Sequence, residues 1–106
     1  MIDKRKINEI VSKIAMSINP KKIILFGSYA VEKAKDDSDL DLLVVVEDSA
    51  LPYYKRARSI RKHLWGISDI PKDIVVYTEK EINEWQGVKS SFIANILAYG
   101  KVIYEN

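Results

Sequence analysis

The sequence contains no cysteine and a single histidine, His63. Disulfides, thiolate nucleophiles and cysteine-ligated zinc sites are therefore excluded. Nothing near His63 in the sequence forms a catalytic triad, so we interpret it as an ordinary residue on a helix. Any chemistry must depend on carboxylates, hydroxyls and amines.

Long apolar segments and a strong net charge are also missing. The longest apolar run, residues 42–46, is far shorter than the roughly twenty residues of a membrane helix, so we expect a soluble cytoplasmic protein without a membrane partner. Seventeen Lys and Arg nearly balance fifteen Asp and Glu, and a net charge of +2 does not by itself indicate nucleic-acid binding. With 106 residues, 47% of them hydrophobic, we expect a single domain over residues 1–106.

The hydrophobic pattern predicts alternating helices and strands. Apolar residues three and four apart predict a first helix at 7–18, which Asn19-Pro20 ends. Thr78 and Glu81 have the spacing of a capping box at the start of a later helix. This alternation predicts an α/β (α+β) fold whose sheet is covered by helices on both faces, with parallel or mixed strand pairing. Strands are predicted at 23–26, 39–46 and 74–77, a terminal strand or tail at 101–104, and further helices at 28–35, 52–65, 79–85 and 91–98.

The predicted helix at 52–65 carries both aromatic and basic residues. Its apolar stripe includes Tyr54 and Trp65, which we interpret as core or rim rather than as a base-stacking platform. Trp85, Tyr53 and Tyr99 receive the same interpretation. The basic residues would lie on another face, which is either solvated or meets a triphosphate, RNA or an acidic partner; they are Lys55, Arg58 and Lys62.

The strongest chemical signal is a pair of carboxylates, Asp39 and Asp41, two apart in a predicted strand. This spacing places both side chains on one face, where their repulsion favours a divalent cation such as Mg²⁺ or Mn²⁺. Asp73, at the start of a strand expected to neighbour this one, is the third candidate ligand, and Asp69 is a poorer one because it precedes Pro71. Three carboxylates would hold two ions, which bind a triphosphate and stabilise departing pyrophosphate in nucleotidyl transfer.

Simpler interpretations of these carboxylates remain open. Asp39 and Asp41 could be a solvated strand end, and Asp73 a strand-entry residue. A calcium loop fits poorly, because Asp37, Asp39 and Asp41 begin the EF-hand pattern but Leu42 occupies the glycine position.

Gly27-Ser28 follows the first predicted strand and opens the predicted helix at 28–35. Unpaired backbone N–H groups and the helix dipole at such a turn favour a phosphate. Gly27 would let the phosphate approach the backbone and Ser28 would add a hydroxyl donor, although Ser28 could instead be only a helix cap.

Together, the segments IILFGSYA, SDLDLLVVV and KDIVVY resemble the minimal nucleotidyltransferases of the DNA polymerase β superfamily. The resemblance covers nearly the whole chain and implies a nucleotidyltransferase fold with a mixed sheet. It implies that Gly27 and Ser28 contact nucleotide phosphates and that Asp39, Asp41 and Asp73 bind metal, with Asp73 closest to the attacking hydroxyl. The implied reaction transfers a nucleoside monophosphate, AMP from ATP being the leading choice, to a hydroxyl.

The smallest members of this superfamily resemble antitoxins encoded beside HEPN-type toxins, and some of them modify a toxin tyrosine with AMP. The resemblance therefore implies a HEPN-type partner protein, or a homo-oligomer, that supplies the acceptor. One departure is that Ala30 is followed by Val31 and Glu32, where the family often has an arginine. This favours as alternatives a binding module that neutralises its partner by contact, or a subunit that modifies a small molecule or an RNA end.

Overall fold

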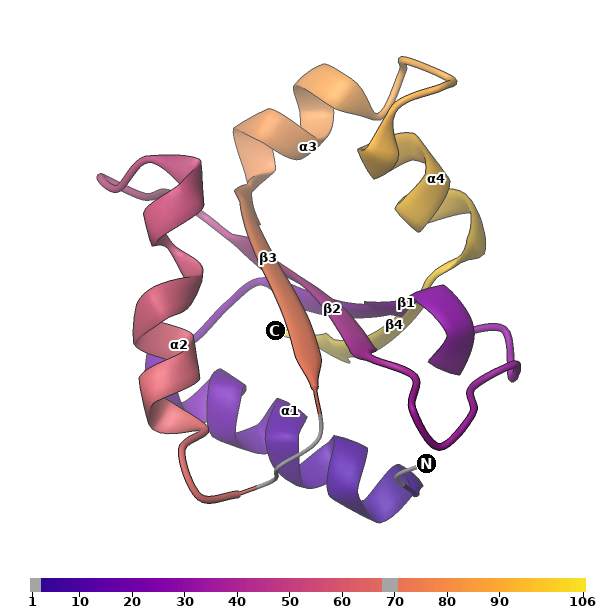
Figure 1. The fold of residues 1–106 in the computed structure, drawn as a ribbon. Coiled ribbons are helices and arrows are strands. Elements are labelled where there is room, and N and C mark those ends of the chain that lie inside the picture. Colours follow the sequence, from indigo (N-terminus) through magenta and orange to yellow (C-terminus); the bar gives the residue numbers. More distant parts are fainter. Residues whose placement is uncertain (1–2, 68–70) are drawn as a thin grey trace.

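The computed structural model describes residues 3–67 and 71–106 of the chain (Figure 1). These residues form four helices and four strands, together with two short 3₁₀ turns, labelled η. In chain order the elements are α1 (Lys4–Ile18), β1 (Lys22–Phe26), η1 (Gly27–Tyr29), β2 (Leu40–Val46), η2 (Tyr53–Lys55), α2 (Ala57–His63), β3 (Lys72–Thr78), α3 (Glu79–Trp85), α4 (Phe92–Tyr99) and β4 (Lys101–Glu105).

The four strands form one mixed sheet in the order β3-β2-β1-β4. β1 pairs antiparallel with both β2 and β4, while β2 and β3 pair in parallel. The sheet therefore confirms the predicted proximity of the second and third strands, and the terminal segment is a strand. Its central strands are apolar on both faces because helices cover both sides.

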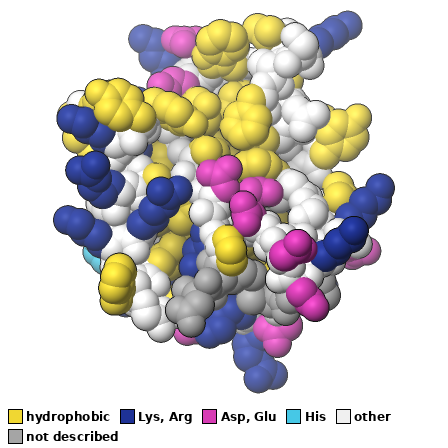
Figure 2. Space-filling view, in the orientation of Figure 1, with side chains coloured by type: hydrophobic (Ala, Val, Ile, Leu, Met, Phe, Trp, Pro, Cys, Tyr) yellow, Lys and Arg dark blue, Asp and Glu magenta, His cyan; other side chains and the backbone are white. Residues whose placement is uncertain are grey.

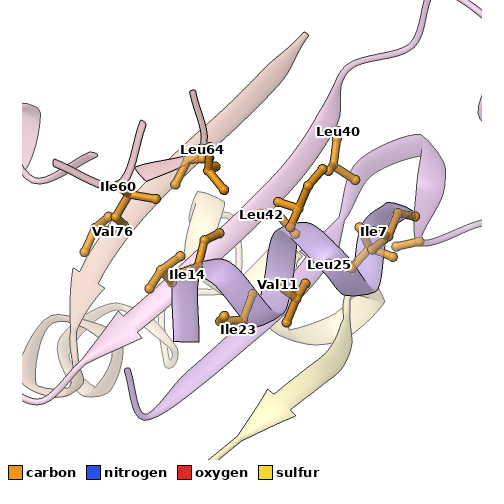
Figure 3. Close-up of a cluster of buried hydrophobic side chains, with 14 residues drawn as sticks. Ile7, Val11, Ile14, Ile23, Leu25, Leu40, Leu42, Ile60, Leu64 and Val76 are labelled. Carbon is orange, nitrogen blue, oxygen red and sulfur yellow. The ribbon is translucent and has the colours of Figure 1, made fainter. Parts of the chain in front are cut away.

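Alternating residues of β2 supply the two sides of the core. Leu40, Leu42 and Val44 belong to a cluster with the buried side chains of α1 and α2, whereas Leu43 and Val45 pack with Ile96 of α4. Figure 1 shows α1 and α2 on one side of the sheet and α3 and α4 on the other. Figure 3 shows the first cluster, in which Ile7, Val11 and Ile14 of α1 lie against β1 and β2, and Ile60 and Leu64 lie near Val76 of β3.

Local signals explain several helix ends. Asp3 caps α1 by accepting a hydrogen bond from the backbone N–H of Lys6, and the left-handed Asn19 ends the helix. Thr78 and Glu81 form the predicted capping box of α3, and Ser91 caps α4. In the described part of the chain, no helix combines the length and hydrophobicity needed to cross a membrane.

The predicted helix at 28–35 is wrong. Only the 3₁₀ turn η1 forms there, because Glu32 has a φ of 59° and the backbone N–H of Lys33 bonds back to the carbonyl of Ser28. Ala30 is the one fully buried side chain of this segment, so little apolar burial would have stabilised a longer helix.

The interpretation of the aromatic residues as core or rim is also wrong for the most exposed of them. Trp65 is 90% exposed and Tyr54 77% exposed, and Tyr99, Trp85 and Tyr53 are exposed as well. η2 and α2 together form the predicted helix at 52–65, but only α2 is α-helical. The 3₁₀ turn changes the helical phase, so Ile60 and Leu64 are buried while Tyr54 is not.

Candidate active site

Strand register brings two of the three candidate aspartates together. Asp41 in β2 is the direct partner of Asp73 in parallel β3, and it is also the partner of Phe26 in antiparallel β1. By alternation both carboxylates lie on the α3/α4 face of the sheet, at the end where β2 and β3 begin. Asp39 lies two residues earlier, just outside β2, and is exposed, as is Asp73. Asp69 lies outside the described residues.

Gly27 packs directly against Asp41. Its φ of 74° lies in the left-handed region, and a Cβ added there would overlap Oδ2 of Asp41 and lie 3.0 Å from Cγ. Two independent constraints, backbone conformation and space, thus require glycine at this position. The Gly-Ser turn and the aspartate strand are parts of one site.

Burial and charge repulsion within this group both act on Asp41. Its pKa is raised from 3.8 to about 6 by burial, by the nearby charge of Asp73 and by that of Asp39. The three carboxylates therefore share one electrostatic environment, in which a bound cation would be favourable.

The donor set fits magnesium or manganese, since every nearby candidate ligand is a carboxylate oxygen. Across residues 3–67 and 71–106, however, no three Asp, Glu, His or Cys side chains are arranged to hold a metal ion by themselves. In the described residues Asp39, Asp41 and Asp73 thus do not form a three-carboxylate centre, and their role as metal ligands stays a prediction. Mg²⁺ commonly takes one or two carboxylates and completes its shell with water and substrate phosphates, and this arrangement suits that pattern.

Ser28 is half-buried in η1, next to Gly27. Because η1 has only three residues, the helix dipole expected from a longer helix contributes little there. A phosphate at this turn would instead depend on backbone N–H groups and on the hydroxyl of Ser28.

Two phenylalanines that we did not identify from the sequence pack together beside Asp41, one of them directly paired with it. Phe26 lies beside Asp41 in the sheet, and Phe92, at the start of α4, packs edge-on against Phe26 with ring centroids 5.6 Å apart. Phe92 is 49% exposed. Alternation along β1 would have identified Phe26, but the contact with Phe92 depends on tertiary packing.

A cavity of about 480 Å³ lies away from this site. Ile7, Leu25, Tyr29 and Ile103 contribute to its lining, and none of the three aspartates does. Leu25 belongs to the core cluster on the α1 side of the sheet. We locate the site at the carboxylates of Asp39, Asp41 and Asp73, because their charges act on one another and the Gly-Ser turn packs against Asp41.

His63 plays no part in this group. It is exposed at the end of α2, where its Nδ1 lies 2.8 Å from the carbonyl oxygen of Ser59. This agrees with its interpretation as an ordinary helix residue.

Comparison with known structures supports the fold. A candidate nucleotidyltransferase from Sulfolobus solfataricus superposes with a TM-score of 0.67 at 20% identity, over 96% of this chain and 79% of that one. A toxin–antitoxin structure with AMP-PNP superposes with a TM-score of 0.57 at 21% identity, over 92% of this chain and 73% of the other. Sequence comparison with curated proteins gives no match.

Family comparison is more specific. Residues 6–106, which include the Gly27-Ser28 turn and all three aspartates, match the family described as polymerase beta, nucleotidyltransferase. The chain belongs to this nucleotidyltransferase family.

Proposed function

We propose that the protein is a metal-dependent nucleotidyltransferase that transfers AMP from ATP to a hydroxyl group. The observation that carries this proposal is the contact of Gly27 with Asp41, which is paired in turn with Asp73. A turn able to receive phosphate thus lies directly against a concentrated negative charge. This combination favours the binding of a metal-bound phosphate.

In this proposal each residue has a distinct role. Backbone N–H groups at Gly27 and the hydroxyl of Ser28 bind triphosphate oxygens, while Asp39 and Asp41 hold the cation. The exposed Asp73 orients the acceptor hydroxyl and accepts its hydrogen bond. The hydroxyl gives its proton to the Asp73 carboxylate as its oxygen forms a bond to the α-phosphorus, the bond between the α-phosphorus and the bridging oxygen breaks, and pyrophosphate leaves. When bound, Mg²⁺ or Mn²⁺ supplies the neutralising charge for this displacement.

We further propose that the acceptor hydroxyl belongs to a partner protein of the HEPN type, which the chain would neutralise as an antitoxin. The structural likeness to a toxin–antitoxin complex with AMP-PNP is in keeping with it.

Labelled nucleotide tests the proposal. The protein is incubated with Mg²⁺, a co-encoded partner protein and ATP labelled at either the α- or the γ-phosphate. We expect label on the partner only from α-labelled ATP, with release of pyrophosphate and loss of the signal in Asp41→Asn. Glu84→Gln, an exposed carboxylate of α3, is the matched control. Label transfer that persists in Asp41→Asn contradicts the assigned site.

A second candidate function is neutralisation of the partner by contact alone. The observation that favours it is the exposed pair Val31 and Glu32 after the Gly-Ser turn, where no arginine is available to meet the phosphates. If Asp39→Asn with Asp41→Asn neutralises the partner as well as the parent protein, contact is the function and transfer is not.

A further inference from the structure

The net charge of +2 conceals an uneven distribution. Between Asp48 and Asp69 the chain carries five Lys and Arg and no acidic residue, whereas the remainder has twelve basic and fifteen acidic residues, a net charge of −3. The basic residues of this stretch belong to η2 and α2 and the turn between them. The nearly neutral protein thus has one strongly positive side.

Four of the five cations face solvent. Arg56 is the exception, since it is mostly buried and bonded to Glu81. Within the described residues no ion pair joins a carboxylate to the others, which are Lys55, Arg58, Arg61 and Lys62. Figure 2 shows Lys and Arg side chains gathered over α2. Unpaired cations at this density repel one another, so a polyanion on this surface would be favourable.

Two exposed aromatic residues flank the cations. A groove of about 360 Å³ is lined by Tyr54, Ala57, Arg58, Arg61, Lys62 and Trp65, and we call this surface the α2 groove. Trp65 is 90% exposed and Tyr54 77% exposed, so neither side chain contributes much buried apolar area to the core. Each lies four residues from an arginine, Tyr54 before Arg58 and Trp65 after Arg61. The ammonium of Lys55 lies 5.9 Å from the Tyr54 ring centroid.

The arrangement of the α2 groove distinguishes between two kinds of partner. Protein interfaces generally have an apolar core depleted of charge and a polar rim. The α2 groove differs from this, because cations line it beside the aromatic rings. The larger aliphatic side chains of α2 and its C-cap, Ile60 and Leu64, are buried in the domain core instead. A basic track with aromatic rings beside it is the pattern used for single-stranded nucleic acid, whose bases stack on the rings while its phosphates meet the cations.

We propose that the α2 groove binds a single-stranded polynucleotide. Phosphates contact Arg58, Arg61 and Lys62, and bases stack on Tyr54 and Trp65. In Figure 2 the basic side chains over α2 and the acidic group near the middle of the molecule are on the same face. This binding goes beyond the proposed transfer reaction and does not depend on it, because no residue of the α2 groove belongs to the carboxylate site.

Fluorescence anisotropy with the full chain and labelled twelve-nucleotide oligo(U) and oligo(dT) tests the proposal. We expect binding at low salt whose affinity falls with salt, and each of Arg58→Gln and Arg61→Gln should reduce the slope of log K against log[salt] by about 0.7. Trp65→Ala and Tyr54→Ala should each weaken binding between about fivefold and a hundredfold. Trp65 fluorescence, observed in a Trp85→Phe background, should be quenched by the oligonucleotide.

Matched controls change the same chemistry elsewhere. Lys80→Gln with Lys89→Gln removes two exposed cations, and Trp85→Ala removes an exposed tryptophan of α3. Both should leave binding within about twofold of the parent, as should Asp41→Asn, which separates this proposal from the transfer reaction. Circular dichroism verifies that every variant is folded.

The proposal is overturned if neither oligonucleotide binds at 50 mM salt, or if the control variants lose as much affinity as the α2 groove variants. It is also overturned if poly-glutamate binds as tightly as oligo(U) and Trp65→Ala has no effect on binding. This last result would identify the α2 groove as a docking surface for acidic proteins. Binding of oligo(U) alone or of both oligonucleotides supports the proposal, and the comparison reports whether the 2′-hydroxyl contributes.

Discussion

Gly27 meets two requirements at once, a left-handed backbone and a close approach to Asp41. Gly66 meets only the first, since its φ is 84° and an added Cβ would have open space around it. Substituting the two glycines therefore separates two losses of stability. One is due to the left-handed backbone conformation, and the other to the overlap of an added Cβ with Asp41. This makes Gly66 a matched control for the site.

We predict that Gly66→Ala lowers the free energy of unfolding by about 1–2 kcal/mol, the cost of a left-handed alanine. Gly27→Ala should lower it further and also displace the Asp41 carboxylate, reducing transfer activity about a hundredfold. Denaturant unfolding and the labelled-ATP assay measure the two effects. If Gly27→Ala loses no more stability than Gly66→Ala and retains full activity, the position of the Asp41 carboxylate does not depend on this glycine.

The raised pKa of Asp41 predicts a pH dependence of stability in the metal-free protein. The carboxyl titrates at about 6 in the folded state and near 3.8 in the unfolded chain. The folded protein binds more protons between these values, so the free energy of unfolding decreases as the pH rises from about 4 to about 6. Asp41→Asn should remove this decrease and make the metal-free protein more stable at pH 7, by about 1–2 kcal/mol after allowance for solvent screening.

Urea unfolding at several pH values in the presence of a chelator measures this effect. Asp48→Asn, which changes an exposed carboxylate away from the site, should retain the parent pH dependence. An unchanged slope in Asp41→Asn would show that its carboxyl titrates normally.

At the scale of elements, Arg56 connects the loop before η2 with β3 and α3, a link that the sequence pattern does not predict. Its Nε donates to the carbonyl of Leu51 and its Nη1 to the carbonyl of Val76 and to Glu81. Burial tends to raise the pKa of Glu81, but the hydrogen bonds from Arg56 and from the backbone of Thr78 outweigh this and lower it. The ion pair therefore persists at neutral pH, and the stability it contributes decreases as the pH falls below the usual carboxyl range.

We predict that Arg56→Ala destabilises the protein by about 3 kcal/mol, because it removes the charged partner of the partly buried Glu81 and one hydrogen bond from each of two carbonyl groups. Glu105→Gln, which breaks the exposed pair with Lys22, should cost less than about 1 kcal/mol. Thermal or denaturant unfolding compares the two variants. Similar small losses in both would show that Arg56 acts only as a surface residue.

Local sequence signals predicted most of the elements, and their failures have physical causes. The α1 stripe and the Thr78–Glu81 capping box depend on neighbours a few residues away, so spacing was sufficient. The helix expected at 28–35 does not form, because Glu32 adopts a left-handed conformation that is not expected for glutamate. Tyr54 was misjudged because it lies in a 3₁₀ turn that shifts the helical phase before α2, whereas Trp65 lies just after α2, one residue beyond the buried Leu64.

At the scale of the whole molecule, the site depends on strand register. The sequence suggested that Asp39, Asp41 and Asp73 act together, but their contact requires β2 and β3 to pair in parallel with Asp41 opposite Asp73. The different environments of the three aspartates depend on β1 as well, because its pairing brings Phe26 and Gly27 against Asp41 alone. Register between distant strands involves non-local contacts, which local periodicity does not determine.

Since the described carboxylates do not form a complete metal site, metal and nucleotide should bind together rather than in sequence. Phosphate oxygens would complete the shell of an ion held by one or two aspartates, and each ligand would raise the affinity of the other by the same factor. We predict that Mg²⁺ alone raises the melting temperature by less than about 2 °C. Mg²⁺ with a non-hydrolysable ATP analogue at a hundred times its Kd should stabilise by about 2.7 kcal/mol, a shift of about 10 °C or more.

Differential scanning fluorimetry checks this coupling in the full chain. Asp41→Asn and a chelator should each abolish the shift with nucleotide, while Glu84→Gln should retain it. A full shift with Mg²⁺ alone would mean that the protein holds the ion without phosphate, and a shift that survives Asp41→Asn would place the nucleotide elsewhere. Because the measurement needs no acceptor, it separates failure of nucleotide binding from failure to find the partner.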